Sequence, residues 1–134
     1  MTIELPELAV LDDVERSALE RYVRLLVDEL GANLDEIAVF GSVARGERWP
    51  AGMPLRSDLD LLVVTREPLS AAAVERLLEA TFPLFLESGR QLGPQFRTRE
   101  QLERPETEQG RRFVENVRRD AIVLYAAASR RLRQ

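Results

Sequence analysis

The chain has 134 residues, of which 45% are hydrophobic and 31% are charged, and its formal net charge is −4. This length suits one domain with its own buried core, so we expect residues 1–134 to form a single domain. No apolar stretch is long enough to span a bilayer, and the start at Met1 lacks the basic region and apolar run of a signal peptide. The composition therefore predicts a cytoplasmic protein that does not enter a membrane.

Three missing residue types restrict the chemistry further. The sequence has no cysteine and no histidine, and every basic residue is an arginine rather than a lysine. These absences exclude a thiol nucleophile, a cysteine-ligated zinc site, a histidine general base and Schiff-base chemistry. Any enzymatic activity must use carboxylates, hydroxyls, backbone amides, arginines and a hard metal ion. Nucleotidyl transfer fits this set, because it depends mainly on positioning and charge neutralisation.

The first half of the chain predicts a helix followed by two buried strands. Apolar residues recur at helical spacing over residues 12–30, and Gly31 suits the position just after a helix. Ile37–Phe40 is an apolar run of buried-strand length, and Leu59–Val64 is a second one. Residues 47–56, between them, contain two prolines and a glycine, which predicts a loop.

The second half predicts a helix, a strand and a closing helix. Ser70 is suited to cap a helix. We expect the inner face of that helix to carry Val74, Leu77 and Leu78. Residues 91–98 alternate like a strand, and their Gly-Pro pair indicates a sheet edge or a bulge. Apolar residues at helical spacing predict a last helix over residues 107–131. The order of elements predicts a small α/β (α+β) fold.

A first candidate site follows the first strand, where residues 40–46 read Phe-Gly-Ser-Val-Ala-Arg-Gly. Gly41 allows the backbone to turn tightly and approach a ligand without a Cβ in the way. Ser42 can cap a short helix whose free amides form a phosphate site. Taken alone, the pattern is also that of an ordinary strand-to-helix connection.

A second candidate site begins the next strand, where residues 57–60 read Ser-Asp-Leu-Asp. Residues two apart on a strand point to the same face, so Asp58 and Asp60 should project together. Their mutual repulsion would be relieved by a divalent cation such as Mg²⁺, which binds one or two carboxylates together with substrate phosphates. For an isolated Asp-x-Asp, the alternative is a turn residue followed by a solvated strand end.

The positions of the two motifs predict how the strands run. Gly41-Ser42 lies at the carboxyl end of its strand, whereas Asp58 and Asp60 lie at the amino end of theirs. The two motifs can share one site only if these strands are antiparallel neighbours, which predicts a small mixed sheet flanked by helices.

Together, the motifs resemble those of the minimal nucleotidyltransferases of the DNA polymerase beta superfamily, and the resemblance covers nearly the whole chain. It implies that Gly41 and Ser42 hold the phosphates of a nucleoside triphosphate, with ATP as the first choice, while Asp58 and Asp60 bind Mg²⁺. Members of this kind are often the antitoxin of a two-component pair, in which they modify or bind a HEPN-type ribonuclease toxin. The expected activity is transfer of a nucleoside monophosphate to a protein or RNA acceptor.

The sequence departs from this family pattern in one respect. Active members supply a third carboxylate from a later strand, where it acts as general base and metal ligand. The candidate positions here are Gly93, Pro94 and Gln95, and Glu87 is the nearest acid upstream, suited to a solvated surface. The alternative function is therefore a weak or inactive nucleotide-binding or protein-binding pseudoenzyme.

Other residues have two interpretations each. Arg45 can reach a phosphate or form a structural ion pair, and Trp49 can stack on a base or pack against its loop. The arginine pairs after Ser88 can bind RNA or a protein, although a solvated helix face is the ordinary explanation. These pairs are Arg111–Arg112, Arg118–Arg119 and Arg130–Arg131.

Overall fold

The computed structural model describes residues 8, 11–46 and 58–127, so the loop expected at residues 47–56, with Trp49, lies outside the described residues. The elements in chain order are α1 (Asp13–Leu30), the short 3₁₀ helix η1 (Gly31–Asn33), β1 (Leu34–Phe40), α2 (Gly41–Ala44), β2 (Leu59–Thr65), α3 (Ala71–Glu79), α4 (Thr81–Ser88), β3 (Leu92–Thr98), α5 (Arg99–Glu103), α6 (Glu108–Asp120) and β4 (Ile122–Ala126). The predicted α/β arrangement is confirmed.

The four strands form one mixed sheet in the order β3-β2-β1-β4. β1 runs antiparallel to both β2 and β4. The antiparallel pairing of β1 with β2, predicted from the positions of the two motifs, is thus confirmed. β2 runs parallel to β3, and the connection between them contains α3 and α4, since parallel neighbours need a crossover. β3 is an edge strand, which accommodates Pro94 because its missing N–H breaks no interior ladder.

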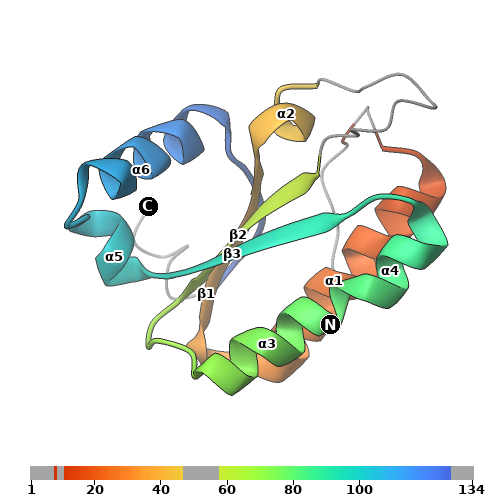
Figure 1. Cartoon of the computed structure of the whole chain (residues 1–134), viewed down its shortest axis with the longest axis horizontal. Coiled ribbons are helices and arrows are strands. Elements are labelled where there is room, and N and C mark those ends of the chain that lie inside the picture. The colour runs from red at the N-terminus through yellow and green to blue at the C-terminus, as the bar shows by residue number, and fades with distance from the viewer. Residues whose placement is uncertain (1–7, 9–10, 47–57, 128–134) are drawn as a thin grey trace.

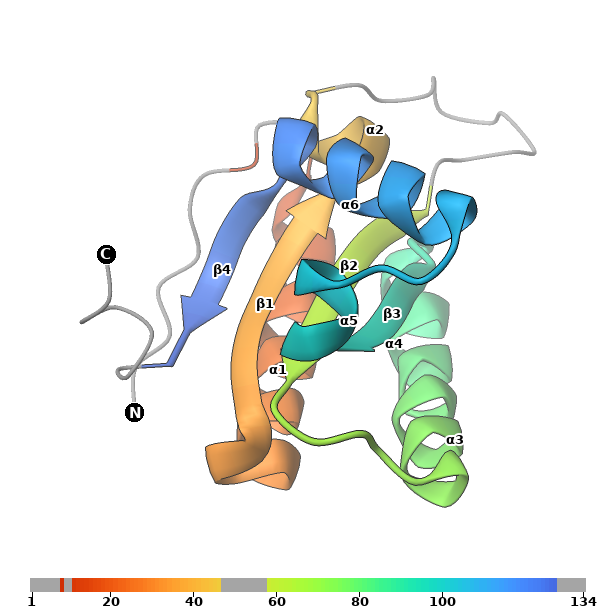
Figure 2. The same cartoon turned by 90° about the vertical axis from the view of Figure 1, so that its left-hand side faces the viewer.

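Helices cover both faces of this sheet (Figures 1 and 2). Alternation along β2 directs Leu61 and Val63 into a core with α1, α3 and α4. Leu62 and Val64 lie on the opposite face, where they pack against α5 and α6. Asp60 has the same alternation as Leu62, so it belongs to the α5–α6 face.

The caps of α1 and α3 match the sequence signals. The Asp12 side chain caps α1 and Gly31 ends it with a φ of +50°. The Ser70 side chain accepts a hydrogen bond from the Ala73 amide at the start of α3. One expectation about α3 is wrong: Leu78 is exposed, while Leu77 alone is buried on this helix. The chain continues into α4, which was not predicted and which tolerates Pro83 because that residue lies in its first turn.

The predicted closing helix over residues 107–131 is confirmed up to Asp120 and is wrong for residues 121–127. α6 ends there, Ala121 is extended, and Ile122–Ala126 forms β4 against β1. The run Ile-Val-Leu-Tyr is rich in β-branched and aromatic residues, which fit a sheet better than a helix. Arg130 and Arg131 lie outside the described residues. No helix in the described part of the chain is both long and apolar enough to cross a membrane.

Candidate active site

Gly41 lies at the turn from β1 into α2, and its backbone has a φ of +77°. A Cβ added at this position would overlap with Oδ2 of Asp60, so a larger residue here would have to displace that carboxylate as well as adopt a left-handed backbone. The first motif is thus in direct contact with the second. Ser42 is the second residue of α2 rather than its cap: Phe40 occupies the N-cap, and no side chain caps the helix. The sequence-based expectation that Ser42 caps this helix is therefore wrong.

Asp58 and Asp60 lie at the start of β2, where pairing of Phe40 with Asp60 places β2 beside the end of β1. Burial raises the pKa of the Asp60 carboxyl above its usual value, and the nearby Asp58 carboxylate raises that pKa further. The Arg45 guanidinium opposes this shift. Two close carboxylates with this electrostatic conflict are the donor set that a hard divalent cation satisfies.

The register between β2 and β3 decides which of the three candidate positions faces this pair. Gly93 lies beside Asp60, whereas Gln95 lies two pairs further along, beside Leu62. The Pro94 side chain is on the opposite face of the strand. A Cβ at Gly93 would stand 3.6 Å from Oδ1 of Asp60 and 3.9 Å from Oδ2 of Asp58. Both aspartates therefore surround a space that a side chain at position 93 would enter.

No acid completes a cluster of three with these aspartates among the described residues. Glu87 instead forms an exposed ion pair with Arg21 of α1, and this hydrogen bond lowers the pKa of its carboxyl. The expectation that Glu87 lies on a solvated surface is confirmed.

Arg45 follows α2 and connects it to the end of α6. Its Nη1 donates a hydrogen bond to Oδ2 of Asp120 at 2.9 Å, which is the structural ion pair that the sequence allowed. Arg45 also lies near enough to Asp60 to affect its pKa. Two of the exposed arginines of α6 have acidic partners, Arg112 with Glu108 and Arg119 with Asp120. This pairing supports a solvated helix face and gives no support to an RNA surface.

A groove of about 830 Å³ lies on the same face of the sheet as Asp60, between the α5 region and α6. Arg97 of β3 and Phe113 of α6 belong to its lining, and the guanidinium carbon of Arg97 lies 4.8 Å from the centre of the Phe113 ring. This cation–π contact joins β3 to α6 next to the groove.

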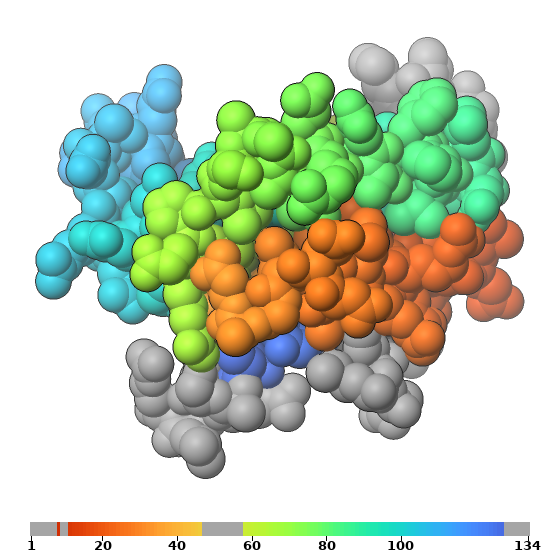
Figure 3. Space-filling model, turned by 90° about the horizontal axis from the view of Figure 1, so that it is seen from below, coloured from red at the N-terminus to blue at the C-terminus, as the bar shows by residue number. Residues whose placement is uncertain are grey.

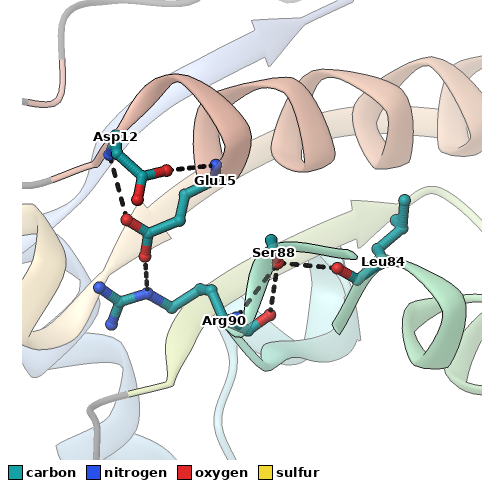
Figure 4. Close-up of polar contacts among 5 residues, drawn as sticks. All are labelled: Asp12, Glu15, Leu84, Ser88 and Arg90. Carbon is teal, nitrogen blue, oxygen red and sulfur yellow. Dashed lines mark hydrogen bonds and ion pairs between the residues drawn. The ribbon is translucent and has the colours of Figure 1, made fainter. Parts of the chain in front are cut away.

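A buried ion pair positions the strand that faces the aspartates (Figure 4). Nε of Arg90 donates to Oε2 of Glu15 at 2.5 Å, and the two side chains are 2% and 0% exposed. Oε1 of Glu15 also accepts a hydrogen bond from the Asp12 amide, so one carboxylate both caps α1 and holds Arg90. The next residue, Gln91, accepts a hydrogen bond from the Leu59 amide at 2.9 Å. This path of hydrogen bonds therefore ends at Leu59, the residue between Asp58 and Asp60.

Neither Glu15 nor Arg90 was recognised as a site-supporting residue from the sequence. The spacing of Asp12 and Glu15 is that of a capping box, which was a visible signal. Nothing in the sequence pairs Glu15 with an arginine 75 residues away.

Fold and site together define a nucleotidyltransferase-type domain: a mixed sheet, a glycine turn after one strand and a carboxylate pair at the start of its antiparallel neighbour. A family model described as a nucleotidyltransferase domain matches residues 19–122, more than half of the sequence. The chain therefore belongs to the nucleotidyltransferase domain family. No curated protein sequence matches it.

Solved structures with similar folds include several toxin–antitoxin proteins. A mutant of the toxin–antitoxin complex MntA–HpeT is similar with a TM-score of 0.54 and 18% identity, over 81% of this chain and 72% of that one. A toxin–antitoxin structure with AMP-PNP has a TM-score of 0.52 and 16% identity, over 81% and 74% of the two chains. A structure of tri-AMPylated Shewanella oneidensis HEPN toxin in complex with MNT antitoxin has a TM-score of 0.52 and 14% identity, over 88% and 77%.

Proposed function

We propose that this chain is a cytoplasmic, Mg²⁺-dependent nucleotidyltransferase that uses a nucleoside triphosphate, with ATP as the first choice. The observation that carries the proposal is the contact between Gly41 and the Asp60 carboxylate, since it joins the phosphate turn to the carboxylate pair. The backbone at Gly41 and Ser42 holds the phosphates, and Asp58 and Asp60 hold the cation. When bound, Mg²⁺ neutralises charge on the transferred phosphoryl group.

The acceptor in this proposal is a hydroxyl group of a partner protein. Its oxygen attacks the α-phosphorus, the bond to pyrophosphate breaks, and the hydroxyl proton leaves to solvent, because no third carboxylate accompanies the aspartates in the described residues. Arg45 exchanges its bond to Asp120 for a phosphate oxygen, which its exposed position allows.

We further propose that the partner is a HEPN-type toxin and that this chain is its antitoxin. The support is the fold shared with chains from toxin–antitoxin complexes, one of them described as containing a tri-AMPylated HEPN toxin and an MNT antitoxin.

Pyrophosphate release provides the test. The purified protein is incubated with Mg²⁺, α-labelled ATP and the helical partner recovered with it from native lysate. We expect pyrophosphate release together with label on the partner, and a loss of at least about 100-fold in Asp58→Asn/Asp60→Asn. Equal release by wild type and variant would refute the assignment of the aspartates. Recovery of no helical partner would refute the antitoxin role.

A second candidate function is a pseudoenzyme that binds nucleotide without transferring it. Gly93 favours this function, because it occupies the position beside Asp60 where a third carboxylate would complete the site. Mg²⁺-dependent ATP binding with no label transfer to the partner would select the pseudoenzyme over the enzyme.

A further inference from the structure

The outer faces of α3 and α4 carry four exposed large apolar side chains. Their exposed fractions are 43% for Leu78, 59% for Phe82, 36% for Phe85 and 66% for Leu86. We call these four residues the α3–α4 stripe. The core contacts of the same helices come from their other side, through Leu77 and Leu84. None of the four stripe residues belongs to the buried core, and each keeps a third or more of its surface exposed.

The stripe is continuous although two helices form it. Ala80, at their junction, keeps a right-handed helical backbone, and Oγ1 of Thr81 donates a hydrogen bond to the Leu78 carbonyl oxygen at 2.7 Å. Phe82 follows Leu78 by four residues, and Leu86 follows Phe82 by four, so these side chains lie along one side of the helical path. In the space-filling view, α3 and α4 lie beside α1 on the surface of the molecule (Figure 3).

Acidic side chains accompany the stripe. Glu75 and Glu79 are exposed and lie at helical spacing from Leu78 and Phe82. Neither carboxylate has an ion-pair partner among the residues that the structure describes.

The arginines nearest to the stripe already have partners. Arg76 of α3 pairs with Glu29 of α1 at 3.4 Å, and Arg21 of α1 pairs with Glu87 of α4. Arg24 of α1 pairs with Glu20 on its own helix at 2.7 Å. The face thus offers apolar groups and unpaired negative charge.

We infer that the α3–α4 stripe docks an amphipathic helix of a partner protein whose apolar residues are flanked by arginines or lysines. Such a helix buries Phe82 and Leu86 and places cations against Glu75 and Glu79. The same face of a second copy fits less well, because it brings the same two carboxylates, and its Arg21, Arg24 and Arg76 already have partners. The stripe lies on the face of the sheet opposite Asp60, so this inference goes beyond the proposed transfer reaction and requires none of its steps.

The test uses two labelled 18-residue helical peptides of defined sequence. Both carry leucines at i, i+3, i+4 and i+7 spacing, flanked by arginines in one and by glutamates in the other. Binding to the full chain is measured by fluorescence anisotropy. We expect the arginine peptide to bind wild type at least tenfold more tightly than the glutamate peptide, and Phe82→Ser/Leu86→Ser to lose at least tenfold of that affinity.

Charge reversal makes the test specific. Glu75→Arg/Glu79→Arg should reverse the preference between the two peptides. The matched control Glu100→Arg/Glu103→Arg, on α5 of the opposite face, should leave the preference unchanged. Equal binding of the arginine peptide to wild type and both stripe variants would overturn the inference. So would a concentration-dependent dimer in sedimentation that Phe82→Ser abolishes, because it would assign the stripe to a second copy.

Nucleotide titration on the same proteins separates this inference from the proposed function. The stripe variants should keep wild-type helix content by circular dichroism and wild-type Mg-ATP affinity. If Mg-ATP binding is intact but each peptide binds wild type and the variants with equal affinity, the docking surface is refuted. The proposed nucleotide site would be unaffected by that result.

Discussion

Gly41 combines a left-handed backbone with close approach to the Asp60 carboxylate. We expect Gly41→Ala to destabilise the fold by about 1–2 kcal/mol through its left-handed backbone and also to displace Asp60, with which a Cβ would overlap. Mg-ATP affinity should fall by at least about tenfold. Gly46→Ala is the matched control, since Gly46 has a φ of +80° but a Cβ there meets nothing within 4 Å. Calorimetry and thermal unfolding of both variants provide the check, and equal loss of affinity in both would contradict the special role of Gly41.

Asp60 should reduce stability in the absence of metal. Its pKa in the folded protein is raised, so the folded state binds the proton more tightly than the unfolded state. The free energy of unfolding therefore falls as the pH rises from the usual aspartate pKa through the raised one. Asp60→Asn removes this loss, and at pH 7 we expect it to be more stable than wild type by about 1 kcal/mol.

Thermal unfolding across pH tests this expectation. The advantage of Asp60→Asn should shrink below the usual aspartate pKa, where the wild-type carboxyl is also neutral. Mg-ATP should raise the melting temperature of wild type but not of the variant. A variant that is less stable than wild type at pH 7 without metal would show that the carboxylate is held by favourable contacts instead.

Gly93 is the position at which a third carboxylate can be restored. The open space next to both aspartates accommodates a Cβ at ordinary contact distances. We expect Gly93→Asp to increase Mg²⁺-dependent pyrophosphate release by about tenfold or more, because a general base typically contributes at least that factor. Gly93→Asn is the control of equal shape without charge. If both variants match wild type in pyrophosphate release, position 93 is not the place where a third carboxylate would complete the site.

At the scale of elements, the buried pair Glu15–Arg90 connects α1 to the start of β3. Removing one partner leaves a buried charge, so Glu15→Gln should destabilise the protein by about 3–5 kcal/mol. The exposed pair Arg21–Glu87 joins α1 to α4, and Glu87→Gln should cost far less, because solvent screens this pair. Urea unfolding of both variants measures the contrast. Similar costs would mean that the buried pair does not hold these elements together.

The elements also show what the sequence could and could not predict. The antiparallel pairing of β1 and β2 followed from Gly41 lying after one strand and Asp58 before the other, because a shared site required it. β4 was missed because its apolar residues continue the helical spacing of α6, and only pairing with β1 distinguishes a strand from a further helical turn. Leu78 was placed inside because an apolar residue next to Leu77 resembles a core position. Burial depends on tertiary contacts that local spacing does not contain.

At the scale of the whole molecule, the sheet separates the proposed nucleotide site from the proposed docking surface. Asp60 and the groove near Phe113 lie with α5 and α6, whereas the α3–α4 stripe lies with α1 on the other side. We therefore expect substitutions in the stripe to leave nucleotide binding unchanged, and substitutions at Asp58 and Asp60 to leave peptide binding unchanged. No third acid accompanies Asp58 and Asp60 among the described residues. Because nucleotide can therefore bind without being transferred, binding and transfer are measured separately.

Calorimetric titration of ATP, with and without Mg²⁺, is the most direct test of the proposed nucleotide site. Wild type and Asp58→Asn/Asp60→Asn are compared after circular dichroism shows that both are folded. We expect saturable binding to wild type that requires Mg²⁺ and weakens by at least about tenfold, or about 1.4 kcal/mol, in the variant. Binding of equal strength in both proteins, or binding to wild type that does not depend on Mg²⁺, would contradict the assignment of Gly41, Asp58 and Asp60 to a nucleotide site.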